Sequence, residues 1–479
     1  MVKPLRLRHG AGRSFPLDQF AKPGRKVSVN ALLGMGLWAL LWLGYNTGLQ
    51  NVLDPRFPAS ATQLIHGLRA FFPMLGGWFA LLMIFARSNR LLPWIMGPLG
   101  LMLLFAVTGL ASSAALSIDP SDALYFGANN LAIVLILLAI VLVENPLPDL
   151  RKVLEFTWIV GTILTLAILG AVPILGSQVI MQTESSPLGV RAYTGTGTIL
   201  GMPSTRTTGF ARYAAISTLV AFAGLMRNGK LAVRIMWGTV FAASLYALVL
   251  ANGRTETLAF IASVLVLMVV QKSKRIFFLL VGAGSAVLLG FTGFYRGFFL
   301  YITRTGQLDL TMTGRTSIWE AGWRLFWKSP WVGLGFEADR YFGAGHMHNA
   351  FLHVLVESGF LGGGAMLIGL AIVWFYLIKY FFFQQPSDKS LIPPEIPAIF
   401  LFVTISSTTE STFAYFSAAW LLSAPVVAYV MALHRYMRRV SLKAAQERAL
   451  RARLVRRESR VMGSPLDVTP STPGGGIPD

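Results

Sequence analysis

The chain contains no cysteine, so several kinds of chemistry are excluded at once. Without thiols it forms no disulfide, offers no thiolate metal ligand and has no cysteine nucleophile. Charged residues are also scarce: they make up 13% of the 479 residues, whereas soluble domains average about 25%. In their place, 54% of the residues are hydrophobic and the mean hydropathy is +0.60. This composition indicates a chain that is solvated mostly by lipid.

Acidic residues are the rarer sign of charge, with 21 Asp and Glu against 41 Lys and Arg and a net charge of +20. In a soluble protein this excess would suggest nucleic-acid binding, but here the basic residues crowd the two ends of the chain. They are Lys3, Arg6, Arg8, Arg13, Lys22, Arg25 and Lys26, then Arg435, Arg438, Arg439, Lys443, Arg448, Arg451, Arg453, Arg456, Arg457 and Arg460. Such flanks face anionic lipid in the cytoplasm. We therefore expect membrane lipids, and not nucleic acid, as a partner, with both termini cytoplasmic.

Apolar runs of roughly twenty residues are needed to cross the hydrocarbon core, and the chain holds about twelve. They lie near 29–48, 70–86, 91–112, 124–143, 153–175, 209–226, 231–251, 257–271, 276–294, 358–383, 395–411 and 414–433. The basic residues of the short connections fall in alternate loops: Arg87 and Arg90, Arg151 and Lys152, Arg227, Lys230 and Arg234, Lys272, Lys274 and Arg275, and Lys379 and Lys389. These loops and the basic termini define one cytoplasmic side. The sequence therefore predicts an all-α polytopic membrane protein.

This topology divides the chain into four parts. A basic cytoplasmic tail, 1–28, precedes the transmembrane domain, 29–433. A basic amphipathic helix, 434–462, follows and is expected to lie on the cytoplasmic leaflet. The remaining residues, 463–479, are rich in Pro, Gly, Ser and Thr and are expected to be disordered.

The opposite face carries the longer loops, 176–208 and 295–350. Arg206, Arg254 and Arg315 should all open onto this face, although basic residues of short loops prefer the cytoplasmic side. Three arginines around one lipid-lined mouth suit a pyrophosphate, because a guanidinium grips phosphate oxygens in a bidentate way.

Two of these arginines also have a plainer interpretation. Arg254 could snorkel at the membrane surface and pair with Glu256 or a lipid phosphate. Arg206 could be a helix-entry residue held at the interface. Arg212 follows Arg206 closely and is a weaker candidate for the same site.

Within the larger loop, Ser317-Ile318-Trp319-Glu320 is typical of a capping box that opens a helix, and Ser329-Pro330 should end it. Trp319, Trp323 and Trp327 recur every four residues, so they should form one stripe along this helix. Such a stripe is either an aromatic belt among the outer headgroups or a platform on which sugar rings stack. In both cases the helix should lie in the membrane plane.

His348 ends this loop and precedes an apolar segment. A neutral imidazole there can accept a proton from a sugar hydroxyl, while Asn349 could cap the following helix or contact the substrate. A metal hypothesis also arises from His346, His348, His353 and Glu357, because His353 and Glu357 are one helical turn apart. They match no ligand spacing of high specificity such as H-E-x-x-H.

Several of these residues belong to a longer pattern. Gly314-Arg315-Thr316-x-x-Trp319 is followed by Pro330-x-x-Gly333-x-Gly335 and by His348-Asn349-x-x-Leu352-x-x-x-x-Glu357-x-Gly359-x-x-Gly362. With Arg206-x-x-Gly209 and Gly253-Arg254-Thr255 upstream, the pattern resembles the bacterial O-antigen ligase family, which includes O-antigen and exopolysaccharide polymerases. The resemblance covers roughly residues 200–375. Glu256 stands where the family usually has a small residue, so the surroundings of Arg254 are expected to differ.

The resemblance implies an all-α, GT-C-like bundle that acts as a metal-independent, cofactor-free, inverting glycosyltransferase of the bacterial inner membrane. Its donor would be a glycan on undecaprenyl pyrophosphate, and its acceptor the lipid A core or a growing polysaccharide, met on the periplasmic face. Pyrophosphate leaves readily, and arginines can stabilise the developing charge without a metal. His348 is the expected base or acceptor-orienting group, with Arg254 and Arg315 as the pyrophosphate clamp. The expected substrate-binding residues are Arg206, Arg212, Asn349, Trp319 and Trp323.

Two other classes of function fit the composition. A transporter or flippase of the same pathway often has about this many spans, but it tends to show repeated halves and broken helices in mid-membrane, whereas the polar residues here gather at one face. A metal-dependent membrane hydrolase would use His346, His353 and Glu357. Ligase and polymerase are not separated by the sequence.

Overall fold

The computed structural model describes residues 27–45, 68–175, 180–181, 198–199, 202–203, 205–227, 229–251, 253–270, 315–343, 346–383, 391–414 and 416–462. Side chains are described within these ranges except for 171–207 and 455–462. The chain divides into two compact units, Met1–Ala432 and Leu433–Asp479. The predicted tails 1–28 and 463–479 and the predicted span 276–294 lie wholly or almost wholly outside the described residues.

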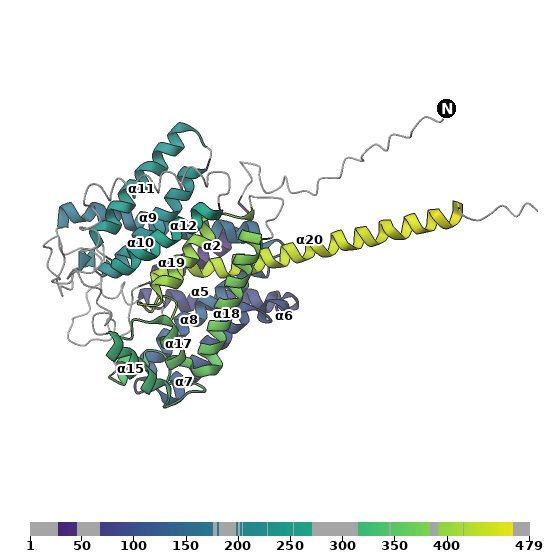
Figure 1. The fold of residues 1–479 in the computed structure, drawn as a ribbon. Helices are drawn as coiled ribbons and strands as arrows, with labels where there is room; N and C mark the ends of the chain where they lie inside the picture. Colours follow the sequence, from purple (N-terminus) through teal and green to yellow (C-terminus); the bar gives the residue numbers. More distant parts are fainter. Residues whose placement is uncertain are drawn as a thin grey trace, which may run out of the picture. The chain divides into compact units, whose positions relative to one another are not determined.

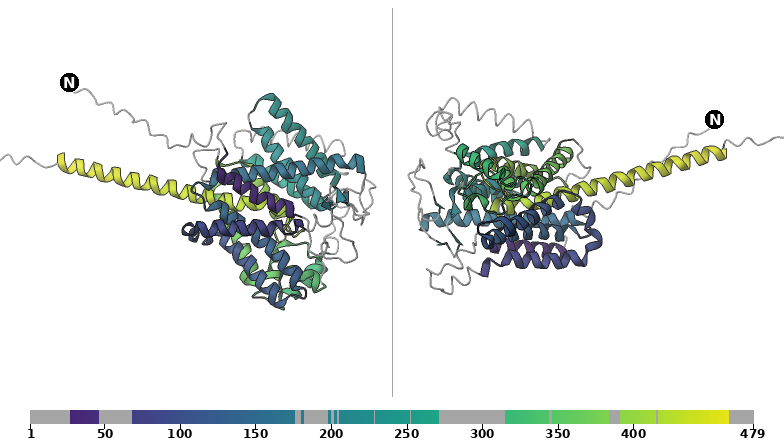
Figure 2. Two further views of the ribbon diagram at one scale, coloured as in Figure 1. Left: turned by 180° about the vertical axis from the view of Figure 1, so that it is seen from behind. Right: turned by 90° about the horizontal axis from the view of Figure 1, so that it is seen from below.

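The first unit is built mainly from helices (Figures 1 and 2), most of which are apolar. In chain order the first of these are α2 (Val29–Gly44), α5 (Phe72–Ala86), η1 (Ser88–Arg90), α6 (Leu92–Ile95), α7 (Pro98–Leu116), α8 (Pro120–Val141), α9 (Pro146–Leu175), α10 (Thr207–Met226), α11 (Leu231–Ala251) and α12 (Arg254–Val270). Ser28 caps α2 by accepting a hydrogen bond from the Ala31 N–H, and Asp119 caps α8 through the Asp122 N–H. Proline opens α7, α8 and α9, where its missing N–H costs no helical hydrogen bond.

The later helices are α15 (Arg315–Phe326), α16 (Ala338–Tyr341), α17 (Ala350–Gly359), the π-helical turn η5 (Phe360–Gly364), α18 (Ala365–Leu377), the π-helical turn η6 (Ile378–Phe383), α19 (Glu395–Ser406) and α20 (Ala418–Met462). Four strands of two residues each interrupt the predicted all-α pattern. Ile180–Met181 (β1) pairs in parallel with Thr205–Arg206 (β4), and Thr198–Ile199 (β2) pairs antiparallel with Met202–Pro203 (β3). All four lie in the first of the two predicted long loops.

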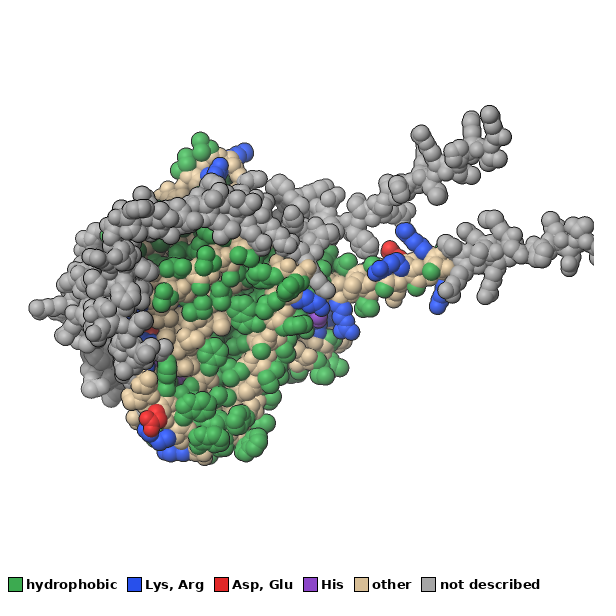
Figure 3. Space-filling model, in the orientation of Figure 1, with side chains coloured by type: hydrophobic (Ala, Val, Ile, Leu, Met, Phe, Trp, Pro, Cys, Tyr) green, Lys and Arg blue, Asp and Glu red, His purple; other side chains and the backbone are tan. Residues whose placement is uncertain are grey.

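Seven helical segments of the described residues are long and apolar enough to cross a membrane: α7, α8, α9, α10, α11, the stretch Ala350–Phe383, and α20. The helices α2, α5 and α19 are shorter but equally apolar. Green hydrophobic side chains cover much of the face seen in Figure 3, and Trp78, Phe85 and Met96 are more than half exposed. An apolar exterior of this extent is expected of a multi-pass membrane protein. Every predicted span except 276–294 overlaps one of the described helices.

Three predicted spans had wrong boundaries. The span 91–112 is broken between α6 and α7, where Gly97 is extended and Pro98 starts a new helix. The span 395–411 ends at Ser406, and the span 358–383 begins earlier, at Ala350. The boundary predicted between 433 and 434 lies next to that of the two compact units, at Leu433. The helix α20 nevertheless continues from Ala418 to Met462 without a break, even at Pro425.

The helix in the larger loop starts earlier than its sequence predicted. Because α15 begins at Arg315, Ser317 lies in its first turn and is not the N-cap of a capping box. The helix ends at Phe326, so Trp327 follows it and Ser329-Pro330 belongs to the next turn. Local capping signals locate helix ends only to within a few residues, since the first and last turns fray or tighten with their surroundings.

The segment Pro330–Gly335, which carries the predicted proline and glycine pattern, makes a close backbone contact with the end of α17. The backbone from Pro330 to Gly335 lies against the end of α17, where the Leu334 and Gly335 N–H groups donate to the carbonyls of Val356 and Glu357 at 2.8 and 3.0 Å. In return, the Phe360 and Leu361 N–H groups donate to the carbonyls of Pro330 and Trp331 at 2.7 and 3.0 Å. The contact satisfies backbone groups that the helix break would otherwise leave unpaired.

Two glycines make this approach possible. Gly359 has φ +61°, and a Cβ there would lie 2.3 Å from the Trp331 backbone. Gly333 has φ +76°, and a Cβ there would lie 2.3 Å from the Glu357 backbone. Both positions require a left-handed conformation and close backbone contact, which only glycine provides without strain.

Candidate active site

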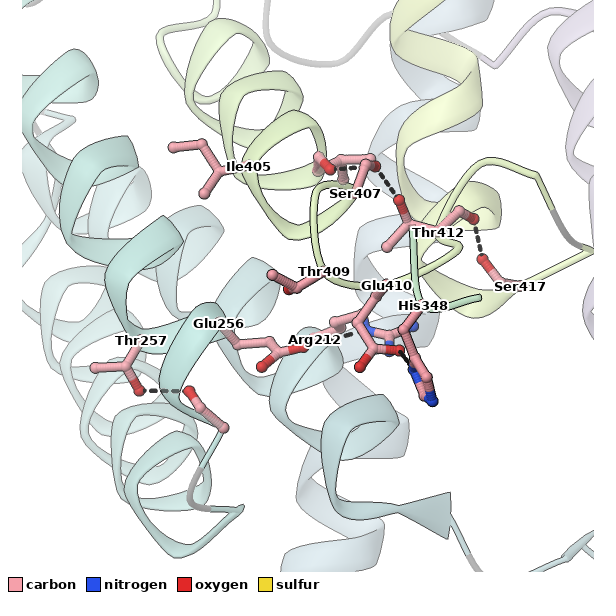
Figure 4. A network of polar contacts seen from close by, with 12 residues as sticks. Arg212, Glu256, Thr257, His348, Ile405, Ser407, Thr409, Glu410, Thr412 and Ser417 are labelled. Carbon is pink, nitrogen blue, oxygen red and sulfur yellow. Dashed lines mark hydrogen bonds and ion pairs between the residues drawn. The ribbon is translucent and has the colours of Figure 1, made fainter. Parts of the chain in front are cut away.

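The carboxylate of Glu410 joins side chains from three distant parts of the chain, two of which, Arg212 and His348, are labelled in Figure 4. Glu410 lies in the non-helical turn between α19 and α20 and is buried. Its Oε2 accepts a hydrogen bond from Arg212 Nη2 at 2.8 Å and lies 3.4 Å from His348 Nδ1. Its Oε1 lies 3.4 Å from Arg315 Nη2. One buried acid thereby brings together Arg212, Arg315 and His348, all three of which the sequence had singled out.

Helix packing explains why these residues meet. α10 packs against α12 and α19, and α12 packs against α19. Arg212 lies near the start of α10 and Glu256 near the start of α12, so the two face each other with Nε and Oε1 3.4 Å apart. The turn that carries Glu410 follows directly from α19. The start of each helix and the end of α19 therefore meet at one end of the bundle.

Arg212 forms two ion pairs, which its position in the sequence did not predict. Its guanidinium is engaged by Glu256 on one side and Glu410 on the other, and its side chain is only 12% exposed. Figure 4 shows the three residues side by side. A buried arginine with two carboxylates is an ion-pair core that ties α10 to α12 and to the turn after α19. This is also where Glu256, the residue that departs from the family pattern, finds a partner.

Arg315 is placed differently. It is the first residue of α15, and its Nη1 donates to the Thr409 carbonyl at 2.7 Å. Its side chain is 23% exposed, about twice as much as that of Arg212. Arg315 therefore reaches the same turn as Arg212 but keeps part of its guanidinium accessible.

The other two predicted arginines lie at helix starts nearby. Arg254 is the first residue of α12, two positions before Glu256, and is partly exposed. The preceding Gly253 lies against α10, since a Cβ there would be 2.7 Å from the Cβ of Ala211. Arg206 ends β4 immediately before α10, and its side chain is not among those described.

His348 has an unusual backbone conformation. Its φ is +47°, a left-handed value rarely adopted outside glycine. The neighbouring backbone is held firmly: the Met347 N–H donates to Asp339 Oδ2 at 3.1 Å, and the Met347 carbonyl accepts from Trp319 Nε1 at 2.9 Å. On the other side, the Ala350 N–H donates to the Ser407 carbonyl at 2.9 Å. Such a conformation persists only when its surroundings impose it, and it recurs at functional sites.

Three further predicted residues have structural contacts of their own. The Asn349 side chain caps α17 by accepting hydrogen bonds from the Phe351 and Leu352 N–H groups, which was the plainer of its two interpretations. The aromatic stripe is split: Trp319 is partly buried and holds Met347, whereas Trp323 and Trp327 are 47% and 65% exposed. A role of Asn349, Trp319 or Trp323 in substrate binding stays a prediction.

A second cluster of ionisable residues lies beside His348. Its members Asp339, His353 and Glu357 are fully buried. His353 Nε2 lies 3.1 Å from Glu357 Oε1 and 3.4 Å from Asp339 Oδ1, and His353 Nδ1 lies 3.0 Å from Ser411 Oγ. His346 Nδ1 is 3.6 Å from Asp339 Oδ2, and the rings of His346 and His348 are 4.3 Å apart.

The pKa values of Glu410, Asp339 and His346, which lie outside the membrane-spanning helices, follow from these contacts. Burial alone would raise the pKa of Glu410, but the charges of Arg212 and Arg315 and the contact with His348 lower it to about 2. Burial likewise opposes ionisation of Asp339, yet His353 and His346 hold its pKa well below the usual range. Burial lowers the pKa of His346 to about 4. At neutral pH both carboxylates are therefore ionised and His346 is neutral.

Some observations in this region favour a metal site, and the contacts of His353 oppose one. Donor atoms of Asp339, His346 and His353 lie within 4.8 Å of one another, as do those of His346, His348 and Glu410. The hydrolase interpretation thus gains a carboxylate that the sequence had not supplied. However, His353 Nε2 already lies at ion-pair distance from two carboxylates, 3.1 Å from Glu357 and 3.4 Å from Asp339, and such contacts favour a protonated ring. A metal ligand would instead have to present a lone pair.

Sequence reasoning missed Glu410, although a signal was available. It lies in Ser406-Ser407-Thr408-Thr409-Glu410-Ser411-Thr412, a polar run at the end of the predicted span 395–411. The predicted topology puts that run on the same face as Arg315 and His348, and ionisable residues at a membrane mouth are functional candidates by default. Asp339 was missed as well, and it had no comparable signal because it lies inside a loop with other polar residues.

Comparison with known proteins covers part of this region. Residues 239–367 match the family described as O-Antigen ligase. The exopolysaccharide production protein ExoQ of Rhizobium meliloti (strain 1021) is 38% identical over 93 residues, which is 16% of this chain and 20% of that protein. The chain thus covers about a fifth of the length of this relative. The predicted resemblance is confirmed over the segment that holds Arg254, Arg315 and His348, while Arg206, Arg212 and Glu410 lie outside the family match.

Proposed function

We propose that this chain is a glycosyltransferase of the bacterial inner membrane that moves a glycan from undecaprenyl pyrophosphate to a sugar hydroxyl. The O-antigen ligase match and the likeness to an exopolysaccharide production protein indicate a role in polysaccharide biosynthesis. The observation that carries the finer proposal is the shared carboxylate of Glu410, which contacts His348, Arg315 and Arg212. A base and phosphate-binding groups are thereby within reach of one substrate.

The base is His348. Its Nδ1 faces the ionised Glu410, so a proton on Nδ1 leaves the lone pair of Nε2 available for an acceptor hydroxyl. Glu410 also stabilises the imidazolium that forms when His348 takes the proton, as the acid does in catalytic triads. The acceptor oxygen attacks the anomeric carbon while the bond from that carbon to the phosphate oxygen breaks. The electron pair leaves with the pyrophosphate, and attack from the opposite face inverts the anomeric centre.

The pyrophosphate site is formed by the more accessible arginines. Arg315 is held by the Thr409 carbonyl, and its 3.4 Å contact with Glu410 is long enough for an anionic donor to compete for it. Arg254 and Arg206, at the starts of α12 and α10, supply further positive charge. Arg212 orients Glu410 and does not itself bind the donor. Charge developing on the leaving group is stabilised by these arginines, so the transfer step needs no metal or other cofactor.

The proposed topology has both termini in the cytoplasm and the site on the periplasmic face. The residues 29–433 form the transmembrane catalytic domain, and about twelve spans of a GT-C-like bundle cross the membrane. The distal part of α20 lies on the cytoplasmic side. The acceptor is either the lipid A core or a growing polysaccharide chain, which makes the enzyme a ligase or a polymerase.

Replacing His348 tests this proposal. In a strain that lacks the native gene, His348→Ala should insert normally but lose about 10²–10⁴-fold of the transfer activity, as loss of a general base does. Surface glycan and lipid-linked glycan are both analysed on gels. His434→Ala, a histidine of α20 outside the site, serves as the control and should retain activity. A His348→Ala strain with normal glycan in both fractions would remove His348 from the mechanism.

The defect also identifies the acceptor. Single repeat units stalled on the carrier indicate that a polymerase has been lost. Long chains on the carrier, with bare lipid A core outside, indicate a ligase. A flippase would instead leave the donor unconsumed by purified wild-type protein.

The clustered donor atoms of Asp339, His346 and His353 make one further measurement necessary. Purified protein treated with EDTA should still consume a lipid-linked donor at the rate of untreated protein. Loss of activity that only added Zn²⁺ or Mg²⁺ restores would favour the hydrolase.

A further inference from the structure

We propose that His353 is a positioning residue that sets the distance between His348 and Glu410. This inference rests on the proposed function, because it assigns a role relative to the proposed base and its acid. His353 itself is fully buried and touches no surface open to a substrate. Its ring contacts Ser411, which follows Glu410, and Asp339, which binds the backbone of Met347 next to His348.

The first connection reaches Glu410. His353 Nδ1 lies 3.0 Å from Ser411 Oγ, and Ser411 is buried and directly follows Glu410. The turn 407–414 is not helical, and its hydrogen bonds to other segments hold Ser407, Thr409 and Thr412, on either side of Glu410 and Ser411. A side-chain anchor at Ser411 therefore restricts where the Glu410 carboxylate can lie.

The second connection reaches His348 through Asp339. His353 Nε2 lies 3.4 Å from Asp339 Oδ1, and the other oxygen of Asp339 accepts the Met347 N–H at 3.1 Å. Met347 directly precedes His348, whose φ of +47° must be imposed by its neighbours. The Asp339 contact supplies part of that restraint.

Glu357 fixes the ring itself. Its Oε1 lies 3.1 Å from His353 Nε2, one helical turn along α17, and accepts the Glu337 N–H at 3.1 Å. Nε2 therefore lies at ion-pair distance from both Glu357 and Asp339, and Nδ1 either donates to or accepts from the Ser411 hydroxyl. Whichever direction the hydrogen bond with Ser411 takes, each ring nitrogen of His353 has a polar contact. His353 thus forms a bridge from Ser411 to Asp339 whose length is fixed by a rigid imidazole.

The bridge matters because hydrogen-bond geometry at the base decides its effectiveness. His348 Nδ1 and Glu410 Oε2 are 3.4 Å apart, at the long end of hydrogen-bonding distance. A displacement of about 1 Å in a catalytic group can cost on the order of a hundredfold in rate. A residue that holds both partners therefore acts on turnover and not on donor affinity.

Ser411→Ala is the most selective test, since it removes one end of the bridge and no charge. We expect kcat to fall about tenfold, with KM for an undecaprenyl-pyrophosphate-linked donor within about twofold of wild type. Ser423→Ala is the matched control, because Ser423 is a buried serine that bonds only to its own helix. It should retain kcat and KM.

A double-mutant cycle separates positioning from a general structural effect. If Ser411 acts through Glu410, Ser411→Ala should lower kcat less than about twofold in a Glu410→Gln background, because residues that act as a unit are not additive. Two independent, multiplying losses would overturn the proposal. So would a Ser411→Ala variant that changes KM alone or turns over like wild type.

Hydrogen exchange gives a readout that does not depend on the reaction. In His353→Gln, peptides covering 346–352 and 407–414 should both exchange faster than in wild type, while peptides of α7 and α8 stay unchanged. Unchanged exchange in both segments would overturn the bridge. If His353→Gln does not insert, Ser411→Ala is measured in the same way and should affect 407–414. A wild-type protein that transfers no glycan would refute the proposed function, whereas the exchange result would still decide whether the bridge exists.

Discussion

The carboxylate of Glu410 is shared by Arg212, Arg315 and His348, so its ionisation is tied to the folded state. Its folded pKa of about 2 lies below the ordinary value of 4.5. The charged form therefore stabilises the fold above about pH 4.5, and this stabilisation is lost as the pH falls from there towards 2. One pKa unit corresponds to about 1.4 kcal/mol, so the contribution at neutral pH is roughly 3 kcal/mol.

A glutamine at this position tests that linkage. We expect Glu410→Gln to lower the melting temperature of the detergent-solubilised protein at pH 7, and the difference from wild type should shrink as the pH is lowered to 3. Glu320→Gln is the control, because the Glu320–Arg324 pair is exposed on α15 and exposed pairs contribute only about 0–1 kcal/mol. A difference between Glu410→Gln and wild type that does not change with pH would contradict the lowered pKa.

At the scale of single elements, the break after α17 is the feature most exposed to mutation. The α17 helix ends at Gly359, whose positive φ turns the chain into η5 while the Pro330–Gly335 backbone docks alongside. The same docking contact aligns the segment that leads, through α16, to Met347 and His348. A substitution of Gly359 should therefore also displace the backbone that leads to Met347 and His348.

Gly359→Ala is expected to destabilise the protein by about 1–3 kcal/mol or more, because a side chain adds left-handed strain and also meets the Trp331 backbone. The yield of folded protein and its melting temperature in detergent measure the effect. Gly364→Ala is the matched control five residues later, since a Cβ there meets nothing within 4 Å and φ is an ordinary −60°. If the two variants are equally stable, the close approach at Gly359 does not limit the fold.

At the scale of the whole molecule, the basic residues at both ends of the chain predict its orientation. A reporter that is active only in the periplasm should give no signal when fused after residue 479 and a clear signal when inserted near residue 308. Both fusions are measured in intact cells with protein levels matched by immunoblot. A periplasmic signal from the C-terminal fusion would overturn the proposed topology and move the site to the other side of the membrane.

Much of the architecture followed from local patterns. Apolar runs predicted the helices, because each span must satisfy its own backbone hydrogen bonds within a lipid-facing segment. Errors concentrated where polar and apolar signals met: the predicted span 395–411 absorbed the turn that carries Glu410, and the capping box at Ser317 misplaced the start of α15. Hydropathy averages over many residues, so it detects a span but not the point where the helix ends.

The sequence by itself determined the membrane class of this protein, the resemblance now confirmed over residues 239–367, and the importance of His348, Arg254 and Arg315 as candidates. Only the tertiary structure decided which side chains meet. It paired Arg212 with Glu256 and Glu410, put Glu410 beside His348, and gave His353 its contacts with Ser411 and Asp339. Residues 212, 348 and 410 come from different helices and turns, and their convergence depends on how those helices pack. Periodicity along the chain carries no information about that packing.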